Sequence, residues 1–480
     1  MNKLKGLEPR KVFEFFEEIS GIPRGSGNMK KIADYCVSFA EKRGLKYLRD
    51  EADNVVIFKD ATKGCENADA VILQGHLDMV CQKTEESEID FLSDGLDLFV
   101  DGDFVKARGT TLGADNGIAV AMVLAILDSE EISHPALEAV FTTDEEIGMI
   151  GALKLDMSYL KGKKMINLDA EEDGILTVSC AGGSDFLITV PVERKKVTGD
   201  FVKITLKGLK GGHSGVEIND GRVNADVLAG RFLNHMKNCV SFDLISVDGG
   251  DKGNAIPNFC NIELLTDDSA FFKNEAEKYL DIVKKEISER EPSFEYLINT
   301  GEEKTVSALT EEIKNKIIFT LVSAPNGVAE MSKEIEGLVE TSLNLGILKT
   351  EEEKIILHFT LRSNKKSALV FLEEKLGAFS DYLGFESESF GHYPPWEYKG
   401  NSSLQQIYKE SFTEQNGYEP RLEAIHAGLE CGVFASAIEN LDCVALGPAL
   451  WDVHTVNEKL SVSSTERTFK LVVKILEKCI

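Results

Sequence analysis

The pattern that most restricts the fold of this chain is the alternation of strand-like and helical segments over its first third. The runs "NVVIFK", "AVILQGH", "EAVFTT" and "KMINLDA" have the composition of strands, and the second is apolar enough to be buried on both faces. Between them lie segments with helical spacing, "NMKKIADYCVSFAEKRG" and the buried-helix pattern "NGIAVAMVLAILDS". This alternation predicts an α/β sheet, in which functional groups gather where strands end.

The pattern of strand-like and helical segments changes twice along the sequence, which indicates two domain boundaries. Long alternating strands such as "DFLITVPVER" and charged amphipathic helices fill the middle of the chain, and the α/β pattern returns at "HYPPWEYKG". We expect a catalytic domain formed by residues 1–186 and 392–480, with a second domain, residues 187–391, inserted into it. Within the insert, the order strand, helix, strand, strand, helix, strand runs twice, over roughly 201–300 and 304–390, which predicts a duplicated α+β unit.

Charge and cysteine content restrict the partners and the compartment. A formal net charge of -28 argues against nucleic acid or an anionic membrane as partner, because both need clustered Lys and Arg. Nine cysteines are present with no pair closer than Cys431 and Cys443, so neither a CxxC zinc ribbon nor a dense disulfide framework is indicated. The longest apolar run, "GIAVAMVLAIL", is too short to span a bilayer, and a cytoplasmic protein with reduced thiols is expected.

Polar residues of metal-ligand type stand at the ends of the predicted strands. "ILQGHLDMV" places His76 and Asp78 two residues apart, so a carboxylate can lie beside the imidazole and orient it. Taken alone, this pair is also typical of a surface histidine beside an acid. In "RGTTLGADNGIAVA", Asp115 directly precedes a buried helix, where a helix N-cap is as good an interpretation as a metal ligand.

Three consecutive carboxylates in "FTTDEEIGMIGA" follow a run that should end inside the sheet crevice. Like charges there repel and are costly to desolvate, which predicts a strongly positive partner. "INLDAEEDG" again ends a strand with Asp169, and "LWDVHTVNE" supplies His454. The five expected ligands are His76, Asp115, Glu146, Asp169 and His454.

Two histidines and three carboxylates suit two divalent cations that share one carboxylate. Mixed imidazole and carboxylate sites favour zinc, with Co²⁺ and Mn²⁺ as alternatives, over magnesium or calcium. Glu145 is adjacent to a ligand and is not needed as one. We therefore expect it to act as a general base on a metal-bridging water, whose pKa the cations would lower toward neutrality.

Eight motifs together resemble the zinc exopeptidase and amidohydrolase family that includes carboxypeptidase G, peptidase T and the PepV dipeptidase: "GHLDMV", "RGTTLGADNGIA", "TTDEEIGMIGA", "NLDAEEDG", "GGHSG", "GNAIPN", "HAGLECG" and "HTVNE". Within that family they are most similar to the aminoacyl-histidine dipeptidase (PepD, Xaa-His dipeptidase, carnosinase-like) subgroup, and the resemblance covers almost the whole chain. It implies an α/β catalytic domain with a central mixed sheet flanked by helices, plus an inserted α+β lid domain.

The resemblance assigns the ligands to individual ions. It implies that Asp115 bridges two zinc ions, with His76 and Asp169 on one and Glu146 and His454 on the other.

Further roles follow from the resemblance alone. It implies that Asp78 orients His76, that Glu145 is the general base, and that the lid residue His213 in "GGHSG" stabilises the oxyanion of the tetrahedral intermediate. On the bare sequence, His213 is an ordinary loop histidine.

Three more residues are expected at the substrate. The resemblance places Arg362 at the substrate's terminal carboxylate, a task suited to the planar guanidinium. It also makes Asn254 in "GNAIPN" and Gly428 in the glycine-rich loop "HAGLECG" contacts to the substrate.

The expected function is that of a cytosolic dizinc dipeptidase that hydrolyses unblocked dipeptides, including Xaa-His dipeptides such as carnosine. Alternatives of the same chemistry are an N-acyl amino acid deacylase and a broader di- or tripeptidase. A non-catalytic metal-binding protein would not need Glu145, and a dimetal phosphoesterase would carry more basic residues near the site. The lid leaves two arrangements open: a homodimer through this domain, or a doubled lid that mimics the dimer within one chain.

Overall fold

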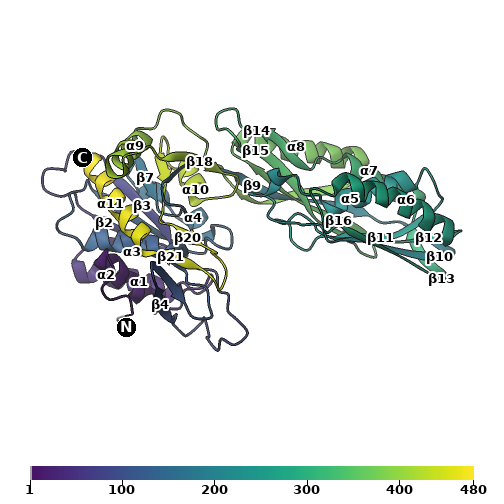
Figure 1. The fold of residues 1–480 in the computed structure, drawn as a ribbon. Coiled ribbons are helices and arrows are strands. Elements are labelled where there is room, and N and C mark those ends of the chain that lie inside the picture. The colour runs from purple at the N-terminus through teal and green to yellow at the C-terminus, as the bar shows by residue number, and fades with distance from the viewer. Residues whose placement is uncertain (1–2) are drawn as a thin grey trace. The chain divides into compact units, whose positions relative to one another are not determined.

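The computed structural model describes residues 3–480, which divide into two compact units (Figure 1). Unit 1 runs from the start of the described chain to Cys180 and includes Trp396–Ala424 and Leu429–Ile480. Unit 2 comprises Ala181–Pro395 and Ile425–Gly428.

Three short segments that the sequence places in the catalytic domain lie in unit 2, namely residues 181–186, residues 392–395 and Ile425–Gly428. The N–H of Ala181 donates to the carbonyls of Ile425 and Ala427, at 3.1 and 3.0 Å. A local sequence pattern does not predict contacts between segments so distant in the chain, which explains the difference.

Unit 1 contains an eight-stranded sheet with the order β1-β2-β6-β3-β7-β19-β8-β18. The central strands β6, β3, β7 and β19 are parallel, and β1, β2 and β8 pair antiparallel, so the sheet is mixed. The strands are β1 (Lys46–Arg49), β2 (Val55–Lys59), β3 (Val71–His76), β6 (Leu137–Thr142), β7 (Lys164–Asn167), β8 (Ile175–Cys180), β18 (Arg421–Ile425) and β19 (Asp442–Ala445). The four predicted strands correspond to β2, β3, β6 and β7, and the α/β fold is confirmed.

The helices of unit 1 differ in how much of their surface is apolar. α3 (Ala114–Asp128) is buried along nearly its whole length and packs on α1 and β3, which is why its sequence is apolar on every side. The others are α1 (Arg10–Ser20), α2 (Lys30–Arg43), α4 (Ile150–Lys154), α9 (Ser403–Asn416), α10 (Glu430–Ala437), α11 (Val462–Lys478) and the 3₁₀ turn η1 (Met157–Tyr159). A small sheet joins β20 (Leu450–Trp451), β21 (Lys459–Ser461), β5 (Phe104–Ala107) and β4 (Leu98–Asp101).

Unit 2 is built on one long sheet with the order β13-β10-β12-β11-β15-β16-β9-β17, and β14 pairs with β15. Its strands are β9 (Gly182–Pro191), β10 (Arg194–Lys207), β11 (Asp243–Gly249), β12 (Cys260–Thr266), β13 (Glu295–Leu309), β14 (Gly327–Met331), β15 (Val339–Thr350), β16 (Lys354–Ser363) and β17 (Glu386–Tyr393). Its helices are α5 (Ala225–Met236), α6 (Ser269–Ile287), α7 (Glu311–Ser323), α8 (Lys366–Leu383) and the 3₁₀ turn η2 (Ile218–Asp220). Alternate residues of β16, Ile355, Leu357, Phe359 and Leu361, are fully buried, and Figure 1 shows the four α-helices along one face of the sheet.

The sheet of unit 2 consists of two halves with the same strand order, one nested in the other. The first half reads β13-β10-β12-β11, and the second, read from the opposite edge, reads β17-β9-β16-β15. The first strand of the second half is therefore β9, which precedes the whole first half in sequence. The expected contiguous second copy over 304–390 is wrong in this respect, because residue 304 lies within β13. A strand's own pattern does not say which strand it pairs with.

Within residues 3–480, no helix combines the length and apolar character needed to cross a membrane.

Candidate metal centre

The parallel strands of unit 1 bring the expected ligands to one edge of the sheet. β3 ends at His76, which is paired with Thr142 at the end of β6, so residues 143–146 begin beside it. β7 runs parallel to β3, and Asp169 follows its end by two residues. The carboxyl ends of parallel strands meet at one edge, which is where ligands bind in open α/β sheets.

Asp115 stands between the two histidines. Its Oδ1 lies 3.3 Å from Nε2 of His76, and its Oδ2 lies 3.0 Å from Nε2 of His454. The N-cap residue of α3 is Gly113, and Asp115 has a non-helical backbone just inside the helix. The carboxylate of Asp115 therefore faces both histidines instead of capping the helix.

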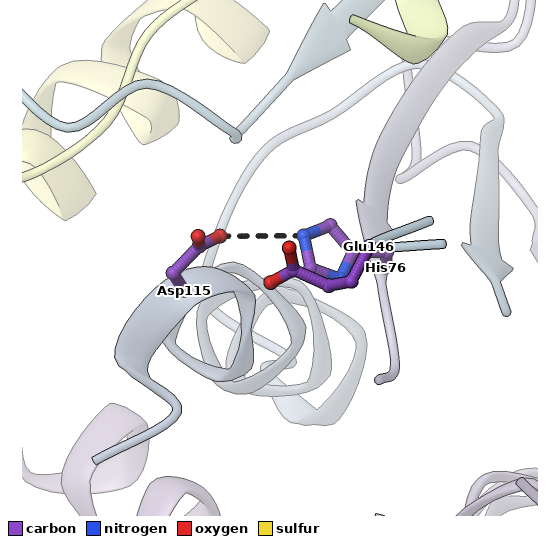
Figure 2. A group of neighbouring side chains, drawn as sticks. All are labelled: His76, Asp115 and Glu146. Carbon is purple, nitrogen blue, oxygen red and sulfur yellow. Dashed lines mark ion pairs between the residues drawn. The ribbon is translucent and has the colours of Figure 1, made fainter. Parts of the chain in front are cut away.

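The remaining acids complete the cluster. Nε2 of His454 also lies 3.0 Å from Oε2 of Glu146, and Nε2 of His76 lies 3.5 Å from Oδ1 of Asp169. Figure 2 shows how the side chains of His76, Asp115 and Glu146 gather from separate elements, and donor atoms of these three lie within 4.8 Å of one another. Two imidazoles and three carboxylates are a donor set that suits zinc or a neighbouring divalent ion.

The protonation of the cluster shows how strongly it attracts positive charge. Burial by itself would raise the pKa of Asp115, but the contacts from His454 and His76 outweigh it and lower that pKa. Contacts with Asp115 and Glu146 raise the pKa of His454 to about 11. Burial raises the pKa of Asp169 to about 6, against the opposing charge of His76. Bound cations would supply the charge that these protons supply otherwise.

Asp78 lies between His76 and the segment that carries Glu145 and Glu146. It is fully buried, and its Oδ1 lies 3.4 Å from Nδ1 of His76. Its oxygens also accept from the N–H of Glu145 at 3.0 Å, from the N–H of Glu146 at 3.2 Å and from Oγ of Ser26 at 2.8 Å. Asp78 thus contacts the imidazole of His76 and the segment after β6 at the same time.

Glu145 is half-buried, and its pKa lies well above the ordinary value of a glutamate. Burial is the largest cause that raises its pKa well above the ordinary value; the charge of His76 opposes this, and the neighbouring Asp169, Glu430 and Glu146 reinforce it. A carboxylate whose pKa is raised toward the working pH accepts a proton more readily than a solvated one.

Unit 2 gathers a second group of expected residues around His213. Its Nδ1 accepts from the N–H of Gly215 and of Val216, both at 3.2 Å, so the ring proton of the neutral form sits on Nε2. Burial and the charge of Arg362 lower the pKa of His213, which keeps the ring neutral. The adjoining loop is held by a bond from Ser214 N–H to the carbonyl of Asn254, at 2.9 Å.

Arg362 is a buried cation in the same unit. It is 7% exposed, and its Nη1 donates to Oη of Tyr393 at 2.9 Å. Burial, followed by the charges of Arg362 and His213, lowers the pKa of His426 to about 3. The motif "HAGLECG" predicts a substrate loop that includes Gly428 but no separate role for His426, whose Nε2 lies 2.7 Å from Oγ of Ser342.

A model of peptidase family M20/M25/M40 matches residues 72–478. The chain belongs to this family. It is 36% identical, over 99% of both chains, to the cytosol non-specific dipeptidase of Escherichia coli. The crystal structure of aminoacylhistidine dipeptidase from Vibrio alginolyticus is also 36% identical, covers 99% of this chain and 98% of its own, and has a TM-score of 0.91. Aminopeptidase PepT from Bacillus cereus shares the fold at 15% identity, with a TM-score of 0.56 over 98% of this chain and 99% of that chain.

Membership of the M20/M25/M40 family makes this protein a peptidase and hence a hydrolase. The resemblance stated on the sequence motifs is confirmed. Unit 1 brings together the expected residues His76, Asp78, Asp115, Glu145, Glu146, Asp169 and His454, and unit 2 holds His213, Asn254, Arg362 and Gly428.

The structure also shows buried polar residues beside the site for which the sequence predicts no role. Glu430 is fully buried and accepts from Oγ1 of Thr142 at 2.6 Å and from Nε2 of Gln74. Burial raises its pKa to about 8. The only sign of Glu430 in the sequence is its place in "HAGLECG". A local pattern does not predict that α10 packs this glutamate against the end of β6.

Proposed function

We propose that this protein is a dipeptidase that hydrolyses unblocked dipeptides, Xaa-His dipeptides among them, with Glu145 as the general base. The observation that carries the proposal is that Glu145 directly precedes Glu146, which contacts His454, and donates its own N–H to Asp78, which contacts His76. The names of the two relatives that are 36% identical, a non-specific dipeptidase and an aminoacylhistidine dipeptidase, support the substrate class.

The residues present fit two divalent cations. His76 and Asp169 would hold one and Glu146 and His454 the other, with Asp115 shared between them. Zinc is the proposed ion, with Co²⁺ and Mn²⁺ as alternatives. When bound, such cations polarise the scissile carbonyl and acidify a water.

The protein's own groups then manage the proton and the charge. Glu145 takes a proton from the attacking water as the C–O bond forms and passes it to the leaving amine as the C–N bond breaks. The Nε2–H of His213 is the proposed donor to the oxyanion, and the guanidinium of Arg362 the proposed partner of the substrate's carboxylate. Asn254 and Gly428 are proposed to contact the substrate, and residues 187–391 to act as the lid.

The first test compares the wild type with Glu145→Gln on a panel of β-Ala-His, Leu-His and N-acetyl amino acids. Glu145→Gln should keep its metal and lose activity by about 100-fold or more. Asp144→Asn is the matched control, since this neighbouring carboxylate accepts a hydrogen bond from Gly27 N–H at 2.7 Å and has no assigned role in the reaction. Activity of Glu145→Gln equal to the wild type would refute the mechanism, and cleavage of N-acetyl amino acids alone would favour a deacylase.

We also propose that the protein acts in the cytosol and that it forms a homodimer through unit 2. The name of the Escherichia coli relative supports the compartment. Light scattering on the purified protein measures the mass directly. A monomer would favour the doubled lid as a substitute for the dimer.

A further inference from the structure

A buried carboxylate outside the ligand set holds the turn that carries Asp115. Glu458 is 3% exposed, and its two oxygens accept four backbone hydrogen bonds. Oε2 accepts from the N–H of Leu112 at 2.7 Å and Gly113 at 2.9 Å, and Oε1 from that of Ala114 at 2.8 Å and Asp115 at 3.3 Å. Hydrogen bonds to a charged acceptor are stronger than neutral ones, so this carboxylate fixes the course of the turn.

Glu458 also ties the turn to the loop that carries His454. Its own N–H donates to the carbonyl of Thr455 at 3.2 Å, and Thr455 N–H donates to that of Asp452 at 3.2 Å. Asp452 and His454 both have positive φ, 54° and 62°, a backbone conformation that persists in such residues only where the surroundings hold it. Backbone hydrogen bonds thus connect Glu458 to the loop that carries His454.

Arg24 binds the same turn through its carbonyl side. It is 2% exposed, and its Nη2 donates to the carbonyl of Gly113. Its Nη1 donates to the carbonyls of Leu77 and Asp78, at 3.0 and 3.1 Å. One guanidinium thus joins the turn before α3 to the segment directly after His76.

Two glycines of the "TLGADNG" motif make room for this guanidinium. Gly113 has a φ of +63°, and a Cβ there would lie 2.6 Å from Nη2 of Arg24. A Cβ on Gly117 would lie 2.5 Å from the same atom. Neither position accepts a side chain without displacing Arg24.

We propose that Arg24 and Glu458 are positioning residues that set the affinity of the metal centre. Through the turn at Gly113 they fix the spacing of the three segments that carry His76, Asp115 and His454. Their opposite charges offset part of the cost of burying each. The inference rests on the proposed metal site and adds to it the groups that hold the metal ligands at the right spacing.

The test compares Glu458→Gln with the wild type and with Glu138→Gln. Glu138 is the matched control, because it is also a buried carboxylate of unit 1 that accepts backbone hydrogen bonds, from Lys161 N–H at 2.9 Å and Gly162 N–H at 3.0 Å. It lies near the start of β6, four residues before Thr142 at the end that faces the site. The measurements are zinc affinity of the metal-depleted protein by competition with a chromogenic chelator, the visible absorption of the Co²⁺-loaded protein, and kcat and KM for a dipeptide.

Glu458→Gln should bind zinc about 10- to 100-fold more weakly, as loss of outer-shell partners generally does, and should show an altered Co²⁺ spectrum. Its kcat should fall while KM stays within about threefold, since the substrate contacts are untouched. Glu138→Gln should match the wild type in all of these. A wild type that binds zinc and cleaves dipeptides, with Glu458→Gln indistinguishable from it, overturns this inference and leaves the proposed function standing. If the wild type neither binds zinc nor cleaves dipeptides, the proposed function and this inference are both wrong.

If Glu458→Gln fails to fold, Gly117→Ala decides the matter. Its Cβ displaces the guanidinium of Arg24 without removing any hydrogen-bonding group. Weaker zinc binding by folded Gly117→Ala supports the positioning role, and unchanged zinc binding refutes it.

Discussion

Oδ2 of Asp115 and Nε2 of His454 lie 3.0 Å apart although 339 residues separate them in the sequence. The other oxygen of Asp115 faces His76, so this one side chain connects both histidines of the cluster. We expect Asp115→Asn to lose at least one metal ion per chain and to lower kcat by about 100-fold or more, because an amide is a poor bridging ligand. Metal content by mass spectrometry, measured beside kcat, checks this. Full metal content with normal kcat would exclude the bridging role.

The tautomer of His213 leads to a second prediction. Because Nδ1 accepts two backbone hydrogen bonds, the proton of the neutral ring lies on Nε2. This N–H would donate a hydrogen bond to a developing oxyanion. His213→Ala should lower kcat by about 100-fold while zinc affinity stays unchanged. His235→Ala is the control, since this histidine stacks on Tyr279 elsewhere in the same unit. Equal kcat in His213→Ala and the wild type would remove His213 from the mechanism.

The buried guanidinium of Arg362 should distinguish free dipeptides from their amides. Arg362→Ala should raise KM for a dipeptide with a free carboxylate by about tenfold or more and leave KM for the corresponding dipeptide amide nearly unchanged. Tyr393→Phe, which removes the hydroxyl that Arg362 contacts, controls for the local hydrogen bond. If Arg362→Ala weakens both substrates equally, the arginine does not recognise the carboxylate.

Asp226 makes the stability of unit 2 depend on pH. It is fully buried at the start of α5, and burial raises its pKa to about 8, although a contact with Cys260 opposes the shift. The ordinary pKa of an unfolded aspartate is about 3.9, so the folded protein retains a proton between about pH 4 and 8 that the unfolded chain has released. The stability contributed by this proton is therefore fully present below pH 4 and is lost as the pH rises through about 8.

Thermal unfolding of the wild type and Asp226→Asn between pH 5 and 9 measures this effect. The amide stays neutral, so the difference in unfolding temperature should shift in favour of Asp226→Asn as the pH rises. Cys260→Ser tests the thiol contact separately, and it should keep the pH dependence of the wild type. A constant difference between Asp226→Asn and the wild type across this range would mean that Asp226 does not titrate on unfolding.

Local sequence patterns were enough to predict the strands β2, β3, β6 and β7 and the polar residues that follow three of them. Apolar runs and their periodicity are local properties, and a parallel sheet then brings the strand ends to one edge without further information. The assignment of Asp115 as the bridging ligand depended on the resemblance, because an aspartate before a helix is equally well an N-cap. The structure excludes that alternative by turning the carboxylate toward His76 and His454.

Which distant segments meet could not be predicted from local patterns and depends on the folded arrangement of the chain. β9 forms the first strand of the second half of the unit 2 sheet although the whole first half follows it in the chain, and no periodicity encodes such pairing. Arg24 and Glu458 are ordinary charged residues in the sequence, and they become anchors only because folding buries both against one turn. A charge in a sequence has no fixed role, since its energy depends on burial and on partners that the fold supplies.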